Sequence, residues 1–276
     1  MRAGIIHPGE MGAAVAAALV DRGHQVSWAS RGRSADTARR AAEAGLGDAA
    51  TVERLVDGSE VILSVCPPHA ALAVADEVGG LGFHGTYLDA NAISPATAER
   101  VADRVTAGGA TYVDGGIVGS PPRQAGTTRL YLSGEGAEGL ARDLFLDSRL
   151  EAVVLPSSAF AASALKMVYA GWTKGSAALI LAIRAAARRH GVEADLAAEW
   201  ARSGPGLEGR VEAAAGSARG KGWRWIGEME EIAATLEQAG LPAGFHLAAA
   251  DVYRRTPRGE IGPDILDRVL DELLGA

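Results

Sequence analysis

The sequence predicts an α/β fold in which a doubly wound N-terminal sheet is followed by an all-α C-terminal domain. Three observations lead to this prediction. Short apolar runs alternate with amphipathic stretches in the first half, a glycine-rich turn follows the first apolar run, and strand-like runs stop after Pro156. The predicted domains are therefore 1–156 and 157–276.

In the first domain, the short apolar runs are predicted strands, and the stretches with helical periodicity between them are predicted helices. Strands are expected at Ala3–Ile6, Gln25–Ala29, Val61–Val65, Thr86–Asp89, Thr111–Asp114, Arg129–Ser133 and Ala152–Leu155. Helices are expected at Met11–Arg22, Thr37–Ala44, Thr51–Leu55, Ala70–Val78, Pro95–Thr106 and Ala137–Phe145. The segment DGGIVGSPPRQAGT, which starts at Asp114, is predicted to be a loop because glycine and proline interrupt it.

The second domain is rich in Ala, Leu, Glu and Arg, which favour helices. Ser157 or Ser158 is expected to cap a long helix that continues to Arg189 and stops at Gly191. Further helices are expected at Glu193–Arg202, Leu207–Ala218, Trp223–Gln238, Ala243–Tyr253 and Pro263–Leu274.

Composition excludes several classes of function. A net charge of −7 and a pI near 5.4 provide no basic field, so neither nucleic acid nor an anionic membrane is an expected partner. The single cysteine, Cys66, excludes an internal disulfide framework, and the six histidines show no metal-ligand spacing. No signal-peptide pattern opens the chain, and the most apolar stretch, 177–187, is interrupted by Arg184. A cytoplasmic protein without a bound metal is expected.

A candidate phosphate-binding turn, GIIHPGEMG at residues 4–12, follows the first predicted strand and opens the first helix. It matches G-x-G-x-x-G except that His7 replaces the first glycine. Gly9 would let the backbone approach a pyrophosphate, and Gly12 would let helix and strand pack closely. Glu10 and Met11 lie between them at the helix N-terminus, which favours anions. The turn predicts a dinucleotide-binding Rossmann domain, and a plain strand-to-helix turn is the alternative.

The segment WASRGRS ends the second predicted strand, where an NAD-specific site usually carries Asp or Glu. It contains Ser30, Arg31 and Arg33 instead, without an acid. Guanidinium groups suit a phosphate dianion, so these residues are expected to bind the 2′-phosphate of NADP(H). The alternative is a solvated basic turn.

Four stretches together resemble the β-hydroxyacid dehydrogenase family, whose relatives include 6-phosphogluconate dehydrogenases and imine reductases. They are HPGEMG with SRGRS, VCPP at 65–68, LDANAISP at 88–95, and DGGIVGS with KMVYAGWTKG. The second half resembles a branch of 6-phosphogluconate dehydrogenase-like proteins with a C-terminal domain of unknown function. The resemblance implies contacts of Cys66, Pro67, Pro68 and Asn91 with the nicotinamide ribose region.

The resemblance also implies a catalytic lysine at Lys166, on the long helix. The family pattern there is K-x-x-N-N, but Tyr169 and Ala170 occupy the asparagine positions. Helical spacing is expected to place Ser163, Lys166, Tyr169, Ala170 and Thr173 on one stripe. Lys166 is the expected general acid/base, Tyr169 is expected to support it, and a surface lysine is the alternative.

Substrate contacts are expected at Gly119 and Ser120, because the family loop D-A-P-V-S-G-G aligns with residues 114–120. Val118 stands at the family's serine, and the hydroxyl returns at Ser120. Thr173 is expected to line the same site. Glu228 aligns with a family lysine near the active site, which predicts better tolerance of a cationic substrate. A solvated acidic helix face is the alternative.

The expected activity is NADP(H)-dependent hydride transfer to or from a small hydroxy/keto substrate of the hydroxyacid type, in a cleft between the two domains. The alternatives are imine-reductase-type C=N reduction and an NADP(H)-binding sensor without chemistry. Because the long helix is largely apolar, a homodimer through the helical domain is expected.

Overall fold

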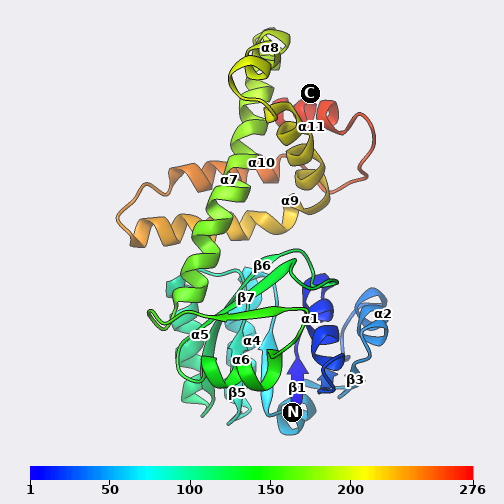
Figure 1. The fold of residues 1–276 in the computed structure, drawn as a ribbon, viewed down its shortest axis with the longest axis vertical. Coiled ribbons are helices and arrows are strands. Elements are labelled where there is room, and N and C mark those ends of the chain that lie inside the picture. Colours follow the sequence, from blue (N-terminus) through cyan, green and yellow to red (C-terminus); the bar gives the residue numbers. More distant parts are fainter. Residues whose placement is uncertain (276) are drawn as a thin grey trace. The chain divides into compact units, whose positions relative to one another are not determined.

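The computed structural model of the protein describes residues 1–275. It contains two compact units, residues 1–166 and residues 167 onward. The division falls inside the long helix α7 (Ala161–Arg189), whose first turns belong to the first unit (Figure 1). Strand-containing and all-helical parts of the chain follow one another as the sequence predicted.

The first unit is built on an eight-stranded sheet with the order β3-β2-β1-β4-β5-β6-β7-β8. The strands are β1 Arg2–Ile5, β2 Gln25–Trp28, β3 Gly47–Asp48, β4 Val61–Ser64, β5 Thr86–Asp89, β6 Thr111–Gly119, β7 Thr128–Ser133 and β8 Glu151–Val154. All neighbouring strands are parallel except β6 and β7. The order of β1 to β6 is that of the Rossmann fold, and it reverses between β1 and β4, where such sheets bind ligands.

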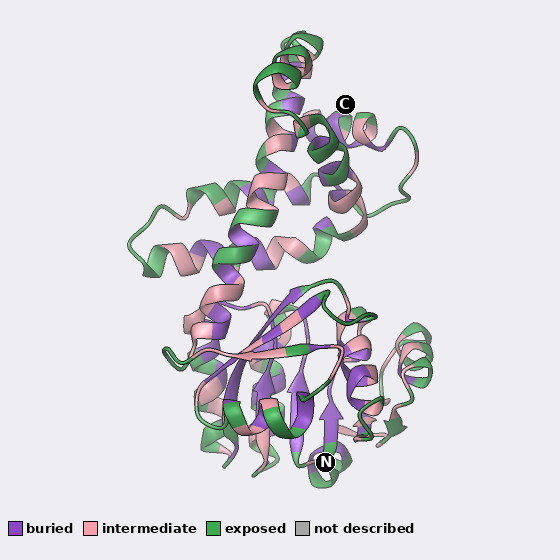
Figure 2. Ribbon diagram, in the orientation of Figure 1, coloured by how far each residue is buried: buried purple, intermediate pink, exposed green. Residues whose placement is uncertain are grey.

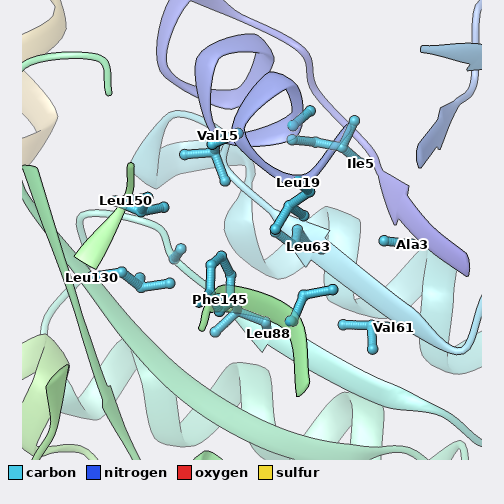
Figure 3. Packing of buried hydrophobic residues seen from close by; sticks show 14 of the residues in the cluster. Ala3, Ile5, Val15, Leu19, Val61, Leu63, Leu88, Leu130, Phe145 and Leu150 are labelled. Carbon is cyan, nitrogen blue, oxygen red and sulfur yellow. The ribbon is translucent and has the colours of Figure 1, made fainter. Parts of the chain in front are cut away.

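Helices cover both faces of this sheet, and alternate strand residues supply the two cores. The helical segments are α1 Glu10–Val20, α2 Ala35–Glu43, α3 Val52–Gly58, the 3₁₀ turn η1 Pro68–Ala70, α4 Ala71–Gly80, α5 Pro95–Ala107 and α6 Ala137–Phe145. On one face, Ile5 and Leu63 pack with residues of α1 and α6, as Figure 3 shows. On the other, Ile62 and Tyr87 pack with residues of α3, α4 and α5. The central strands are accordingly buried (Figure 2).

The prediction of a loop from Asp114 onward is wrong as far as Gly119, because β6 continues through this segment and pairs with β7. Its glycines are required by close packing. A Cβ on Gly115 would lie 2.8 Å from the Asp89 carbonyl oxygen, and one on Gly116 would lie 2.5 Å from that of Ala162. The glycines that suggested a broken segment therefore allow neighbouring backbone to approach.

The second unit consists of the rest of α7 with α8 (Glu193–Ser203), α9 (Leu207–Gln238), α10 (Gly244–Arg254) and α11 (Ile265–Leu274). The prediction of separate helices on either side of residues 219–222 is wrong, since α9 is continuous. Gly222 lies within it because a Cβ there would come within 3.1 Å of the Tyr253 ring. Packing against α10 offsets the low helix propensity of glycine.

Small residues and ion pairs hold the helical unit together. Ten of its twenty buried apolar residues in the described chain are alanines. Arg184, with 7% of its surface exposed, pairs with Glu193 at 3.1 Å and with Glu208 at 2.8 Å, which connects α7 to α8 and α9. Among residues 1–275, no helix has the length and apolar composition needed to cross a bilayer.

Candidate functional site

The turn after β1 shows how His7 and Pro8 replace the first glycine of the motif. The Gly9 amide donates to the His7 carbonyl oxygen at 2.8 Å, a bond between residues two apart. The common form of such a three-residue turn has a negative φ at its central residue, which the ring of Pro8 supplies. Positive φ at non-glycine residues occurs, in the described chain, only at Ala50 and Asp147. The turn thus needs no glycine at position 7.

The N-terminus of α1 lies directly after this turn. A Cβ on Gly12 would lie 2.4 Å from the His7 carbonyl oxygen, so only glycine permits this approach of helix and strand. Gly9 is the N-cap, without a side chain to accept from the first amides, and a Cβ there would meet no described atom within 4 Å. Glu10 and Met11 begin the helix, and Met11 packs against the core. Amides and helix dipole together suit an anion such as a pyrophosphate.

Arg33 lies close to this turn. Burial, and secondly the charge of Arg33, lower the pKa of His7 to about 4. The Arg33 charge also has a small lowering effect on the pKa of Cys66. His7 Nδ1 and Arg33 Nε are buried and have no hydrogen-bond partner within residues 1–275. Arg31 is exposed, and its amide donates to the Ala50 carbonyl oxygen at 2.9 Å. Arg33 and His7 thus supply polar atoms that a bound phosphate group could engage.

The segment from Cys66 to Pro68 is held in place by hydrogen bonds of the Asn91 side chain. Asn91 is 2% exposed, its Oδ1 accepts from the Cys66 amide at 2.6 Å, and its Nδ2 donates to Ser64 Oγ at 3.0 Å. Its amide group therefore positions this segment, in which Pro67 is exposed and Pro68 begins η1. Burial raises the pKa of the Cys66 thiol to about 12, so the thiol is neutral and unsuited to nucleophilic attack.

Two buried carboxyl groups, which the sequence analysis missed, lie where β5 and β6 meet. The strands carry the related segments TYLD, ending at Asp89, and TYVD, ending at Asp114, and these pair in register. The pKa of Asp89 is raised to about 7, mainly by burial and further by the charge of Asp114. The hydrogen bond that Asp89 accepts from the Asn91 amide at 3.0 Å opposes this rise. The repeated four-residue segment was the signal that could have revealed this pair.

The Asp114 carboxylate accepts hydrogen bonds from the first turn of α7. Its Oδ2 accepts from the Ser163 amide at 2.8 Å and from the Ser133 hydroxyl at 3.0 Å, and its Oδ1 accepts from the Ser163 hydroxyl at 2.5 Å. The prediction that Ser157 or Ser158 caps the long helix is therefore wrong, because α7 begins at Ala161 and its first amides reach side chains of β6 and β7. Burial raises the pKa of Asp114, and these hydrogen bonds oppose the rise.

Lys166 follows Ser163 by one helical turn. A Cβ on Gly116 would lie 3.1 Å from the Lys166 Cβ, so this glycine seats α7 directly on β6. Lys166 is half-buried. The sequence has 27 lysines and arginines, and only three of these are lysines: Lys166, Lys174 and Lys221. Gly116 lies two residues beyond Asp114, so Lys166 sits beside the carboxyl-terminal extension of β6.

Gly119 and Ser120 lie at the exposed end of β6. Gly119 has φ of +125°, and a Cβ there would lie 2.4 Å from the Thr127 carbonyl oxygen. The Ser120 carbonyl oxygen accepts from Thr128 Oγ1 at 2.5 Å. The backbone here is therefore fixed, while the Ser120 residue is open to solvent.

The residues of the predicted stripe along α7 differ in their exposure to solvent. Ser163 and Ala170 are each 1% exposed, whereas Tyr169 is 47% exposed. The Thr173 hydroxyl donates to the Tyr169 carbonyl oxygen at 3.1 Å, within its own helix. The Ser163 hydroxyl donates to Asp114, so within the stripe it is already engaged in a buried hydrogen bond.

Glu228 lies inside the helical unit and forms an ion pair with Lys174. Glu228 is 5% exposed, and the Lys174 ammonium lies 5.1 Å from the centre of the Trp225 ring. The Tyr253 hydroxyl donates to the Lys174 carbonyl oxygen at 2.7 Å. Lys174 balances the charge of Glu228, so this charge gives no support to a preference for a cationic substrate.

Comparison with known families agrees with the fold and the turn. Residues 2–141, half of the chain, match the model of the NAD-binding domain of 6-phosphogluconate dehydrogenase. The chain belongs to this family. Residues 187–256 of this 6-phosphogluconate dehydrogenase-like protein match a domain of unknown function, DUF1932. No group of three His, Cys, Asp or Glu residues in its described part could hold a metal ion.

Relatives of this 6-phosphogluconate dehydrogenase-like protein include an uncharacterised 28.5 kDa protein of Methanothermus fervidus, 28% identical over 70% of this chain and 73% of the relative. A conserved protein of unknown function, described as similar to 3-hydroxyacid dehydrogenases, is 27% identical, with TM-score 0.67 over 99% of this chain and 98% of its own.

More distant structures share the fold. Mycobacterium tuberculosis 3-hydroxyisobutyrate dehydrogenase has TM-score 0.69 at 19% identity, over 92% of both chains. Streptomyces aurantiacus imine reductase has TM-score 0.58 at 20% identity, over 100% of this chain and 99% of its own. The protein thus has a hydroxyacid dehydrogenase-like NAD(P)-binding fold with imine reductase neighbours.

Proposed function

We propose that this protein is an NADP(H)-dependent oxidoreductase that transfers hydride between nicotinamide and the carbonyl carbon of a small hydroxy/keto substrate of the hydroxyacid type. The observation that carries the proposal is the uncapped N-terminus of α1 at the point where strand order reverses, with Arg33 beside it. The buried polar atoms of His7 and Arg33 fit a phosphorylated dinucleotide.

The residues that would hold the dinucleotide divide by position. Gly9, Glu10, Met11 and Gly12 would bind the pyrophosphate through the start of α1. Ser30, Arg31 and Arg33 would bind the 2′-phosphate, and the segment from Cys66 to Pro68, held by Asn91, would face the nicotinamide ribose. When bound, the reduced nicotinamide would supply the hydride, and the oxidised form would accept it in the reverse reaction.

Lys166 would move the proton that accompanies hydride transfer. An ammonium can protonate the oxygen that forms on carbonyl reduction, and the resulting amine can take that proton back in the reverse reaction. Its placement against β6 at Gly116, on the strand that ends at the exposed Gly119, supports this role. On the same helix, Tyr169 would support Lys166 in this proton transfer and Thr173 would contact the substrate.

Substrate panels test the reaction class. Purified protein is incubated with NADPH and either small ketoacids or cyclic imines, and NADPH absorbance is followed. Turnover with ketoacids is expected. Turnover confined to imines would favour C=N reduction, which Ala170 in place of a family asparagine also permits. NADPH binding without turnover on either panel would favour a sensor.

The Arg31→Ala/Arg33→Ala variant tests the cofactor. Charge-assisted hydrogen bonds to phosphate contribute about 1.5–3 kcal/mol each, so loss of both arginines is expected to raise the NADPH dissociation constant by roughly two to four orders of magnitude. NADH binding is expected to change only a fewfold. The matched control is Arg39→Ala, since Arg39 is exposed on α2 and paired with Glu43. Equal losses for both nucleotides, measured by calorimetry, would contradict the 2′-phosphate assignment.

A homodimer through the helical unit is also proposed. Val168, Trp172 and Leu179 are 55%, 70% and 60% exposed and recur on α7 at spacings of four and seven residues, a helix-pairing pattern. Trp172 and Leu179 border an apolar groove of about 670 Å³ shared with Phe245 of α10. A second copy of the same helix face would cover these side chains.

Light scattering after size exclusion tests the dimer. The wild type is expected to have twice the chain mass, and Trp172→Glu/Leu179→Glu is expected to have the mass of one chain. Ile261→Glu is the control, because Ile261 is 62% exposed outside the groove. A monomeric wild type at micromolar concentration would refute the proposal.

A further inference from the structure

Three elements meet at the carboxyl group of Asp114. Asp114 belongs to β6, Ser133 to β7 and Ser163 to the first turn of α7, and the three residues are 0%, 0% and 1% exposed. Ser133 Oγ also accepts from the Ala162 amide at 3.0 Å. Two successive amides of the helix start are thus bonded to side chains of the sheet.

The arrangement fixes more than the position of the helix. A single capping bond fixes only one point at the start of a helix. Here one carboxyl oxygen takes the Ser163 amide and the other takes the Ser163 hydroxyl, so both the backbone and the side chain of one residue are held. A negative charge at this end is also favoured by the helix dipole.

Lys166 is the next residue on the same side of the helix, because residues three apart are neighbours on a helix surface. Its stem packs against β6 at Gly116, two residues beyond Asp114 on the same strand. Rotation of the first turn would therefore change where the ammonium points.

We propose that Asp114 is the positioning residue for Lys166: it holds both polar groups of Ser163 and thereby fixes the rotation of α7 that aims the lysine. The proposal rests on the proposed function in giving Lys166 a catalytic role. The geometric part, in which Asp114 controls the orientation of Lys166, stands on the hydrogen bonds alone.

Competitive labelling tests the geometric part directly. The three lysines make every amine site identifiable, so trace acetylation with mass spectrometry gives the rate at Lys166 relative to Lys221, an exposed residue of α9. Asp114→Asn and Ser163→Ala are expected to change this ratio at least about threefold, while the ratio of Lys174 to Lys221 stays constant. The matched control is Ser94→Ala, because Ser94 is a buried cap of α5 whose hydroxyl accepts from the Thr97 amide at 3.3 Å.

Kinetics then test the catalytic part on a substrate found in the panels. A displacement of about 1 Å costs on the order of a hundredfold in rate, so Asp114→Asn is expected to lower kcat by roughly ten- to a hundredfold. The KM of the substrate and the dissociation constant of NADPH are expected to stay within twofold. Ser94→Ala is expected to lose comparable stability in urea without losing kcat.

The outcomes separate the two proposals. An unchanged labelling ratio in folded Asp114→Asn would overturn the positioning role, whatever the kinetics. A changed ratio in a protein whose turnover does not depend on Lys166 would support positioning while refuting the catalytic role of the lysine. If Asp114→Asn does not fold, the Ser163→Ala variant decides by the same ratio, since it removes the hydroxyl and leaves the Asp114 carboxyl in place.

Discussion

Lys166→Ala is expected to lower kcat by about two to four orders of magnitude, the usual contribution of a general acid or base. The NADPH dissociation constant is expected to stay within twofold, because the residues proposed to bind the nucleotide lie on the loops after β1, β2 and β4. A loss that appears equally in kcat and kcat/KM would show that the lysine acts in the transition state. Stopped-flow absorbance of NADPH measures the chemical step.

Two variants control this experiment. Lys221→Ala removes the exposed lysine of α9 and is expected to leave kcat unchanged. Lys166→Arg keeps a positive charge that cannot release its proton near neutral pH, so it is expected to be nearly as slow as Lys166→Ala. An undiminished kcat in Lys166→Ala would transfer the proton donor to another group, for which Tyr169 is the next variant.

The second large effect is expected in the pH dependence of stability. Asp89 has a pKa of about 7 in the folded protein against an ordinary value of 3.8. Between these values the folded state binds a proton that the unfolded state has released, so this group stabilises the fold at low pH and its contribution is lost as pH rises towards 7. At 1.36 kcal/mol for each unit of pKa, the whole effect is roughly 4 kcal/mol.

Asp89→Asn removes this contribution. Its free energy of unfolding relative to wild type is expected to rise steadily from pH 4 to pH 7, which urea titrations at several pH values would measure. The wild type alone would conceal the slope, because the lowered pKa of His7 makes that residue stabilise the fold increasingly as pH rises from about 4 to 6.5. A difference between Asp89→Asn and wild type that does not vary with pH would show that Asp89 titrates normally.

The fold followed from the sequence where the signals were local. Short apolar runs located most strands, and the capping residues Ser34, Thr51 and Ser94 mark helix starts close to those predicted. The nucleotide turn was predictable because its residues are contiguous, and Gly12 has the close contact that the motif requires. Such features depend on neighbours in sequence, which the chain displays directly.

Features that depend on contacts distant in sequence were missed or misread. In the sequence, Gly115 and Gly116 resemble turn residues. In the fold they are glycines because Asp89 and α7 pack closely against them. Glu228 pairs with Lys174, a residue 54 positions earlier on another helix, so the charge of Glu228 alone was misleading. Likewise, Asp114 could not be identified as the cap of α7 from sequence, because the helix start is 49 residues away.

The alanine-rich interior of the helical unit limits which substitutions its buried positions tolerate. Each buried alanine contributes one methyl group, so little apolar surface can be lost there by shrinking a side chain. Enlargement is the greater hazard, since added methylenes in a close-packed interior cost about 1–3 kcal/mol. Positions such as Ala215 and Ala250, both fully buried, are therefore expected to accept only small residues in a library of variants, while the leucines and isoleucines of the Rossmann core tolerate exchange among themselves.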